Sequence, residues 1–336
     1  MRLKRSVVTG PGIARRRRGN GFSYTGPDGA GVDGKTLERI EELVIPPAWK
    51  KVWISPHPNG HIQAVGTDVA GRRQYLYHQA WQDERAEEKF DRVLELSKKL
   101  PEWRRDMADD LNGRGHTRER VLALALHLID IGYFRAGGDQ SAEEFEHYGM
   151  STLLCKHVTV RKDAVEFDFP AKSGVRRVLR IADPEIVKAV RSLRRRTCDS
   201  DRFLVHRNGS EWIEVHAADL NARFKEMVGD EYTVKDLRTW HGTVLAAEAF
   251  VDADPPVEPK VVKRVVSHVM KEVSEALGNT PAVARSSYVD PRVVRAYEAD
   301  QTIAAAKARA DRKRNPRESQ AVVEKATRTL IRKFAD

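Results

Sequence analysis

Cysteine is scarce in this sequence, and long apolar runs are absent. Its 336 residues include only Cys155 and Cys198, which suit a reducing cytosol and are too few for a metal cluster. No apolar run reaches the roughly 20 residues of a membrane-spanning helix, and the opening MRLKRSVVTGPG lacks the apolar centre of a signal peptide. The histidines show no ligand spacing such as H-E-x-x-H. We therefore expect a cytoplasmic protein with inert cysteines, no membrane partner and no metal site.

Acidic residues are too few to balance the basic ones. Lysine and arginine total 59, and aspartate and glutamate total 49, which leaves a formal net charge of +10. Such a charge favours polyanionic partners, nucleic acid first, although a merely soluble basic protein would share it. Arg15 to Arg18 form an unbroken run. A second basic pair precedes amide and aromatic side chains, in the order Arg72, Arg73, Gln74, Tyr75 and Tyr77. This combination suits contacts with phosphates and base edges, so the sequence predicts a nucleic-acid-binding protein.

The first 88 residues have the pattern of a small α+β module. Short β-type segments at 22–24, 51–54 and 61–65 predict strands, and a helical stretch is expected at 36–43. From about residue 82 the apolar period becomes helical, as in DERAEEKFDRVLELSKKL. We therefore expect an N-terminal domain at 1–88 with an antiparallel sheet, and a second domain at 89–336.

The second domain is predicted to be mainly helical with one small sheet. RERVLALALHLIDIGYF is apolar on several faces, which is typical of a buried helix. HVTV and AVEFDF alternate with period two, and the turn PAKSG leads from them into VRRVLRI as a hairpin. Gly278 is expected to end a helix. Helices are predicted at 183–196, 216–228, 234–251, 259–277 and 291–311. The fold class is therefore α+β, with a larger, mainly α-helical C-terminal domain.

Two motifs have the letters of a binding site without the structural context that such a site needs. GAGVDGKT, at 29–36, fits the phosphate-cradling pattern G-x4-G-K-T. That loop must follow a buried apolar strand, and here the short, polar FSYTGPDG precedes it, so we predict a glycine-rich hairpin loop. The acidic DAD at 252–254 lies before two prolines, where such residues are ordinary turn and capping choices. We expect no nucleotide cofactor and no metal from either motif.

A lone tyrosine, Tyr288, lies in the polar segment GNTPAVARSSYVDPR, beside the break at Asp290 and Pro291. Packing tyrosines usually belong to an apolar pattern, so the alternatives are a surface tyrosine and a nucleophile. A phenol has a pKa of about 10, so attack on a phosphodiester requires nearby cations that favour the phenolate. Arginines or metal ions must also hold the charge that develops on the phosphoryl oxygens, and an acid must protonate the leaving oxygen.

The chain offers residues of each required type. Arg135 in GYFRAGGDQ, where glycines permit close approach of a DNA backbone, and Arg238 in YTVKDLRTWHG are candidate phosphoryl ligands. Lys172, in the turn FPAKSGV, is a candidate proton donor at a hairpin tip. Asn279, nine residues before Tyr288, offers a neutral amide donor. Each residue taken alone has an ordinary structural explanation, so only the combination indicates chemistry.

These segments together resemble the type IB DNA topoisomerases in their short bacterial and poxvirus-like form. The resemblance covers nearly the whole chain and rests on LVIPPAWKKVWISPHPNGHIQAVGTDVAGRRQYLYH, GYFRAGGDQ, the lysine hairpin, VKDLRTWHGT and NTPAVARSSYVDPR. It implies, for the second domain, the fold shared by tyrosine recombinases and type IB topoisomerases. It implies a catalytic set at Arg135, Lys172, Arg238, Asn279 and Tyr288. It also implies DNA contacts at Arg73, Gln74, Tyr75, Tyr77 and Lys235.

The activity that the resemblance implies is relaxation of positive and negative supercoils without ATP or metal. Cleavage of one strand would give a 3′-phosphotyrosyl intermediate, and religation would follow. The expected partner is double-stranded DNA in the nucleoid, enclosed by a monomeric clamp. Asn279 departs from the histidine of poxvirus and eukaryotic members, and an amide donates a hydrogen bond without taking a positive charge.

Two alternatives remain open. A tyrosine recombinase or integrase usually carries H-x-x-R at the second arginine, where this chain has Lys235-x-x-Arg238. A non-catalytic architectural DNA-binding protein would have the same charge but would tolerate Tyr288→Phe. It would also give no reason for the tyrosine, the two arginines and the lysine to occur together.

Overall fold

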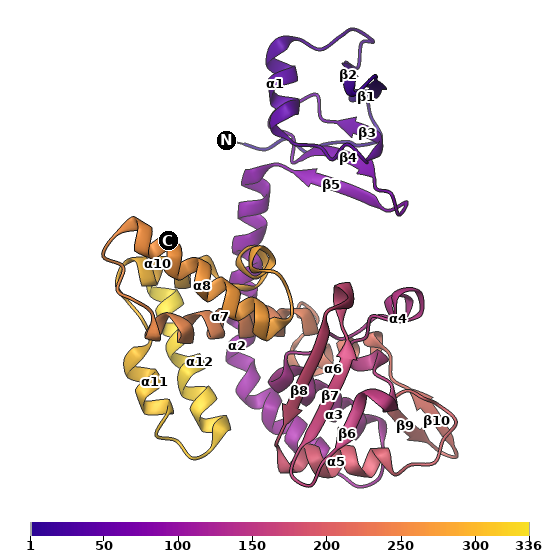
Figure 1. Cartoon of the computed structure of the whole chain (residues 1–336), viewed down its shortest axis with the longest axis vertical. Coiled ribbons are helices and arrows are strands. Elements are labelled where there is room, and N and C mark those ends of the chain that lie inside the picture. The colour runs from indigo at the N-terminus through magenta and orange to yellow at the C-terminus, as the bar shows by residue number, and fades with distance from the viewer. Residues whose placement is uncertain (1, 336) are drawn as a thin grey trace. The chain divides into compact units, whose positions relative to one another are not determined.

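The structure is a computed structural model that describes residues 2–335. The chain divides into two compact units, Met1–Lys89 and Phe90–Asp336. The division falls within one long helix, α2 (Gln79–Leu111), which begins in the first unit and continues into the second (Figure 1). Among the described residues, no helix has both the length and the apolar character needed to cross a membrane.

The first unit is a five-stranded antiparallel sheet with one helix, α1 (Gly34–Glu42). The strand order is β2-β1-β3-β4-β5, so β5 lies at an edge (Figure 1). The strands are β1 (Ile13–Arg18), β2 (Gly21–Thr25), β3 (Lys50–Ile54), β4 (Ile62–Thr67) and β5 (Arg73–Tyr77). Its core is small and comprises Ile13, Ile40, Ile45, Val52, Ile54 and Ala64.

The arginine run, which suits phosphate contacts, forms strand β1 and leaves Arg16, Arg17 and Arg18 exposed. Arg15 pairs with Tyr24 of β2, and its guanidinium donates to the carbonyl oxygens of Ile45 at 3.2 Å, Pro46 at 3.1 Å and Trp49 at 2.8 Å. Burial lowers the pKa of Arg15 accordingly. The Arg15 side chain therefore holds a loop of its own domain. Of the strands in this sheet, β1 and β5 were not predicted from the sequence.

The segment that fits the phosphate-cradling pattern forms the loop between β2 and α1. Asp33 caps the helix, because its Oδ1 accepts from the backbone N–H of Thr36 at 2.7 Å. A carboxylate therefore takes an N–H group that a phosphate loop would leave for its ligand.

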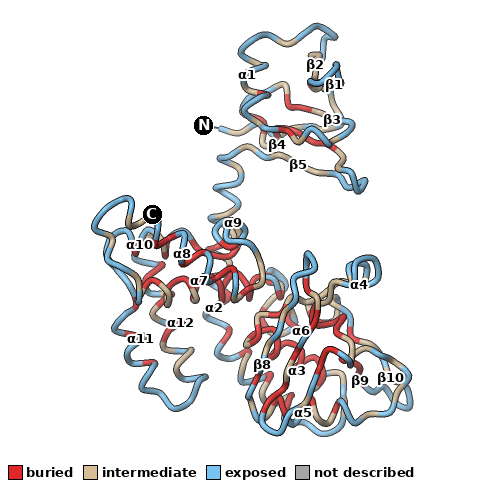
Figure 2. Tube along the Cα trace, viewed as in Figure 1, coloured by how far each residue is buried: buried red, intermediate tan, exposed pale blue. Residues whose placement is uncertain are grey.

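The second unit is mainly helical and is organised around two buried helices. Helix α3 (Arg118–Gly132) lies among α5 (Pro184–Arg194), α6 (Ala217–Val228) and the antiparallel sheet β6-β7-β8. The strands of this sheet are β6 (Val158–Val160), β7 (Val165–Pro170) and β8 (Arg176–Ile181). Helix α7 (Val234–Ala249) is contacted by α8 (Pro259–Leu277), α10 (Pro291–Glu298) and α12 (Pro316–Lys333). Figure 2 shows α3 and α7 buried along most of their length.

Three features of the second unit differ from the expectations. The helix predicted at 291–311 is two helices, α10 and α11 (Ala304–Ala310), because Asp300 adopts a left-handed conformation with φ 56°. A hairpin of β9 (Val205–Asn208) and β10 (Glu211–Glu214) was not predicted, although its two-residue turn, Gly209-Ser210, is a known hairpin signal. Helix α12 was also missed.

Candidate active site

Tyr288 is a buried residue at the end of a short helical segment. It ends the π-helical turn Ala284–Tyr288 and leaves 8% of its surface exposed. Its carbonyl oxygen accepts from Thr243 Oγ1 of α7 at 3.2 Å. A Cβ on Gly242 would lie 2.7 Å from that same oxygen, so only glycine lets the two segments approach this closely. The surface-tyrosine alternative is therefore wrong for this position.

Arg238 lies directly against this tyrosine. It is on the first turns of α7, is 3% exposed, and its Cζ is 5.4 Å from the centroid of the Tyr288 ring. Its Nη1 donates to the carbonyl of Tyr133, just past α3, and its Nη2 donates to Leu277 O at 2.6 Å. Its Nε is buried and has no hydrogen-bond partner among the described residues. One N–H of the guanidinium is therefore left for a ligand.

Arg135 and Asn279 complete this cluster. Arg135 follows α3 and donates through Nη2 to Gly278 O at 3.0 Å. Gly278 ends α8 in a left-handed conformation, φ 62°, as expected for the helix stop. Asn279 comes next, and both of its side-chain atoms, Nδ2 and Oδ1, are buried with no partner within residues 2–335. Such unpaired buried amides are rare in folded proteins, which indicates a site for a polar ligand.

The electrostatics of the cluster favour an anionic ligand. In the described part of the chain, neither Arg135 nor Arg238 forms an ion pair with a carboxylate. Burial, and then the charge of Arg135, lower the pKa of Arg238 to about 10, although interaction with Tyr288 acts in the opposite direction. Burial likewise lowers the pKa of Arg135. A bound anion would relieve this repulsion.

Lys172 is not part of this contact cluster. It begins the turn Lys172–Gly174 between β7 and β8 and is exposed to solvent. Its turn depends on left-handed conformations at Ser173, φ 65°, and Gly174, φ 72°. No hydrogen bond or ion pair to its ammonium group is found among the described residues. The structure therefore brings Arg135, Arg238, Asn279 and Tyr288 together and leaves Lys172 on an exposed hairpin tip.

The proposed DNA contacts of the first unit lie on the edge strand β5. Tyr75 and Tyr77 are exposed and stack with ring centroids 6.0 Å apart, and the Arg73 guanidinium lies 5.5 Å from the Tyr75 ring. Gln74 lies on the other face of the strand, where its Nε2 donates to Asp68 Oδ2 at 2.9 Å. In the second unit, Lys235 is exposed one turn before Arg238 on α7.

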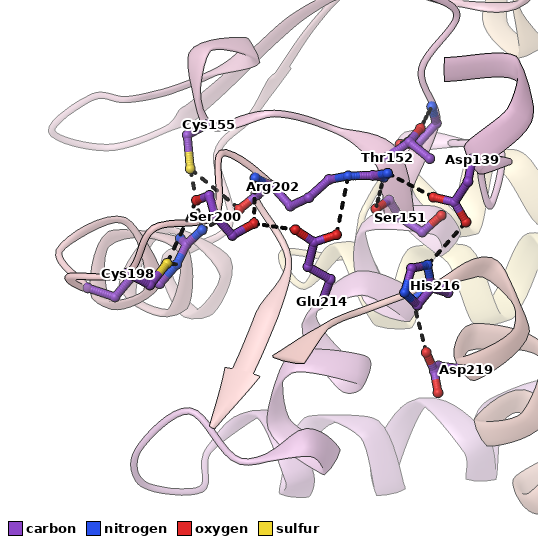
Figure 3. Close-up of polar contacts among 12 residues, drawn as sticks. Asp139, Ser151, Thr152, Cys155, Cys198, Ser200, Arg202, Glu214, His216 and Asp219 are labelled. Atoms are coloured by element: carbon purple, nitrogen blue, oxygen red, sulfur yellow. Dashed lines mark hydrogen bonds and ion pairs between the residues drawn. The ribbon is translucent and has the colours of Figure 1, made fainter. Parts of the chain in front are cut away.

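The segment after Arg135 is held by a separate polar cluster (Figure 3). Asp139, at the start of α4 (Asp139–Phe145), accepts from Arg202 Nη2 at 2.8 Å and lies 3.1 Å from His216 Nδ1. The Arg196 guanidinium contacts both thiols, with Nε 3.1 Å from Cys198 Sγ and Nη2 3.4 Å from Cys155 Sγ. Among the described residues, His, Cys, Asp and Glu nowhere form a group of three or more able to hold a metal ion.

Two family models match this chain. Residues 78–319 match eukaryotic DNA topoisomerase I, catalytic core, and residues 21–68 match bacterial DNA topoisomerase IB, N-terminal domain. DNA topoisomerase 1B of Acanthamoeba polyphaga mimivirus is 31% identical over 296 residues, covering 85% of this chain and 88% of the viral protein. The chain belongs to the type IB DNA topoisomerases. It is therefore an isomerase, and the cluster around Tyr288 lies within the matched catalytic core.

Other relatives of this type IB topoisomerase are more distant. DNA topoisomerase 1B of vaccinia virus (strain Copenhagen) is 22% identical over 67% of this chain and 69% of its own length. DNA topoisomerase 1 beta of Arabidopsis thaliana is 25% identical over 59% of this chain but 21% of its own length. The present chain thus spans only about a fifth of the plant protein.

Sequence reasoning missed two features of this topoisomerase site. Arg177, on β8, packs against Gly278 at the centre of the cluster, and no motif marked it. Behind the site, Arg104 of α2 donates to Asp130 of α3 at 2.7 Å and to Glu324 of α12 at 2.8 Å. His241 of α7 lies 3.0 Å from Asp130, and its ring is 5.1 Å from that of Tyr133. These partners are up to 220 residues apart in sequence, so no local pattern predicts them.

Proposed function

We propose that this type IB topoisomerase relaxes positive and negative supercoils by cleaving and rejoining one DNA strand through Tyr288. Family members act on double-stranded DNA. The observation that carries the proposal is the cluster near the tyrosine: buried Arg238 lies against the phenol ring, half-buried Arg135 binds the turn at Gly278, and the Asn279 amide has no partner among the described residues. A scissile phosphodiester is the anion that this chemistry fits, since guanidinium groups match phosphoryl oxygens.

Each residue has a distinct role in the proposed mechanism. Tyr288 attacks the phosphorus as the phenolate, and the bond to the 5′ oxygen breaks as the 3′-phosphotyrosyl bond forms. Arg135 and Arg238 stabilise the charge that develops on the non-bridging oxygens, and Asn279 donates a further hydrogen bond. Lys172 swings in from the hairpin tip and gives its proton to the leaving 5′ oxygen.

The reverse reaction restores the strand. Rotation of the free 5′ end relaxes supercoils, and the 5′-hydroxyl then attacks the phosphotyrosyl bond. Because the covalent link conserves the energy of the phosphodiester, the cycle needs neither ATP nor a metal ion. Asn279 donates without carrying charge, so its stabilisation is weaker than an imidazolium would give.

We further propose that the protein acts as a monomer that closes around duplex DNA in the nucleoid, with Arg73, Gln74, Tyr75, Tyr77 and Lys235 at the DNA. Phosphate contacts dominate the affinity of such complexes, so binding should weaken steeply as salt rises. Gln74 must exchange its bond to Asp68 for a base edge in this complex.

The test is relaxation of supercoiled plasmid in EDTA without ATP, with denaturant added to trap covalent complexes. We expect relaxation of both positive and negative supercoils. Activity that requires ATP and magnesium would contradict the proposed mechanism. Strand exchange between two sites, without relaxation, would favour the recombinase alternative, and tight binding without any cleavage would favour the architectural one.

A further inference from the structure

Three arginines, and not two, meet at the end of helix α8. The third is Arg177, the second residue of β8 and five residues after Lys172. Its strand neighbours Arg176 and Arg180 are exposed and pair with Asp168 at 2.7 Å and Asp163 at 2.9 Å. Arg177 is half-buried and, among the described residues, has no carboxylate partner. Burial, and then the charge of Arg135, lower the pKa of Arg177. Burying a guanidinium group beside another arginine costs free energy, so the position of Arg177 requires an explanation.

The contacts of Arg177 link three segments. Its Nη2 donates to Ala276 O of α8 at 3.1 Å and to Gly132 O of α3 at 3.4 Å. Its Nη1 lies over Gly278, where an added Cβ would be 2.6 Å away. The carbonyl groups that end a helix carry partial negative charge, which suits a guanidinium. Arg177 thus ties the base of the lysine hairpin to the ends of α3 and α8.

The last carbonyls of α8 are taken in order by three different arginines. Ala276 O accepts from Arg177, Leu277 O from Arg238, and Gly278 O from Arg135. Asn279 follows directly, with its amide buried and unpaired. The direction of the Asn279 side chain is therefore set by a turn in which an arginine binds the carbonyl group of each of the three preceding residues.

We propose that Arg177 is a positioning residue of the strand-cleavage site. It acts through Asn279, whose turn it fixes, and it anchors the strand that carries the Lys172 hairpin. This inference rests on the proposed function, because it assigns a role within the same site. All three arginines donate to backbone carbonyls, and Arg238 in addition lies against the ring of Tyr288.

The test compares Arg177→Met with Arg180→Met in single-turnover cleavage of a short duplex, monitored as covalent complex. Both changes remove one positive charge from β8, but the only partner of Arg180 in the described part of the chain is the exposed Asp163. We expect cleavage by Arg177→Met to be roughly tenfold slower or more, with non-covalent duplex binding and melting temperature close to those of Arg180→Met. Cleavage by Arg180→Met should stay within about twofold of wild type.

A double-mutant cycle with Asn279→Ala separates positioning from general damage. The effects of mutations at residues that act as one unit are not additive. Arg177→Met should therefore slow cleavage by less than about threefold in the Asn279→Ala background. If Arg177→Met slowed cleavage by the same factor in the Asn279→Ala background as in the wild-type protein, the inference would be overturned. Equal cleavage by Arg177→Met and Arg180→Met would overturn it too, while leaving the proposed function intact.

Arg177→Lys gives a second measurement if the methionine variant folds poorly. An ammonium group keeps the charge but lacks the planar fork that reaches Ala276 and Gly132 together. We expect Arg177→Lys to cleave more slowly than wild type, and its loss to vanish in the Asn279→Ala background as well. Wild-type cleavage by Arg177→Lys would overturn the positioning role. Failure of the wild-type protein to form any covalent complex would instead overturn the proposed function and this inference together.

Discussion

The second unit contains two arginine centres, one at Arg104 and one at Arg238, and they differ in the partners of the guanidinium group. Arg104 is held by Asp130 and Glu324, which outweigh the cost of burial and raise its pKa. Arg238 faces other arginines and backbone carbonyls, and its pKa falls to about 10. Tyr133 and His241 join the two centres. The comparison indicates that the first centre holds helices together, whereas we expect the second to bind an anion.

The Arg104 centre, which has carboxylate partners, should contribute more to the free energy of unfolding than the Arg238 centre. Breaking a buried pair by removing one partner typically costs about 3–5 kcal/mol, so Asp130→Asn should lower the free energy of unfolding by about that amount at pH 7. Burial alone would raise the pKa of Asp130, but Arg104 and then His241 hold it well below its usual range. The stabilisation is therefore present above the unfolded pKa of about 3.9 and is lost as pH falls below it.

Urea unfolding at pH 7 and at pH 3 checks this expectation. The difference between wild type and Asp130→Asn should shrink at the lower pH. Asp254→Asn is the control, since Asp254 and its partner Arg264 are both mostly exposed, and it should cost little at either pH. A difference that grew on acidification would contradict the account.

The unpaired centre should dominate catalysis. Arg238→Met removes a donor from the developing charge, and losses of about 10²–10³-fold are typical of such changes, so single-turnover cleavage should fall by about that factor. Non-covalent binding of duplex should change far less. Arg104→Met should give the opposite result, with lower stability but near-normal cleavage well below its melting temperature. Similar cleavage losses in both variants would remove the distinction between the centres.

Two asparagines allow the same comparison between a side chain without partners and one with partners, and the expected effects are smaller. Within residues 2–335 the Asn279 side chain has no hydrogen-bond partner, whereas Asn221 of α6 donates to Ala217 O at 2.9 Å and accepts from the Val234 N–H at 3.2 Å. Loss of one hydrogen bond to a charged group is worth about 1.5–3 kcal/mol, so Asn279→Ala should slow cleavage by roughly tenfold to a hundredfold. Asn221→Ala should lower the melting temperature and leave the cleavage rate nearly unchanged. A slower cleavage by Asn221→Ala than by Asn279→Ala would be inconsistent with this assignment.

The smallest expected effect is stabilisation by a simple anion. Inorganic phosphate at ten times its Kd would stabilise the folded protein by about 1.4 kcal/mol, and thermal unfolding against chloride at equal ionic strength measures this. Arg238→Met should lose most of the effect, while Arg104→Met should keep it. An equal rise in both variants would mean that phosphate acts elsewhere.

Local patterns predicted the parts of the site that depend on neighbouring residues. The helix stop at Gly278 and the lysine hairpin are both present, because each depends on residues within a few positions. The catalytic helices α7 and α8 also lie where apolar periodicity predicted them. The resemblance to a family, and not periodicity, selected the residues that the fold brings to Tyr288.

Contacts between residues far apart in the sequence explain why local patterns could not predict the surroundings of some arginines. Arg177 and Arg180 look alike in VRRVLRI, yet one faces helix ends and the other faces solvent. The run at Arg15 to Arg18 pairs with the next strand, β2, and the guanidinium of Arg15 also binds the loop at Ile45 to Trp49. The side chains of Arg15 and Arg177 bind carbonyl groups that lie 30 and 99 residues away, so composition gives the charge but not its surroundings.

The most direct test of the account identifies the residue that becomes linked to DNA. A duplex labelled on the nucleotide immediately 5′ of the cleavage position would be trapped on the protein by denaturant, and the protein would then be digested with trypsin. We predict that the labelled nucleotide is attached through its 3′ phosphate to the peptide containing Tyr288, and that Tyr288→Phe binds the duplex but forms no adduct. Attachment to another residue, or an adduct with Tyr288→Phe, would contradict the central claim.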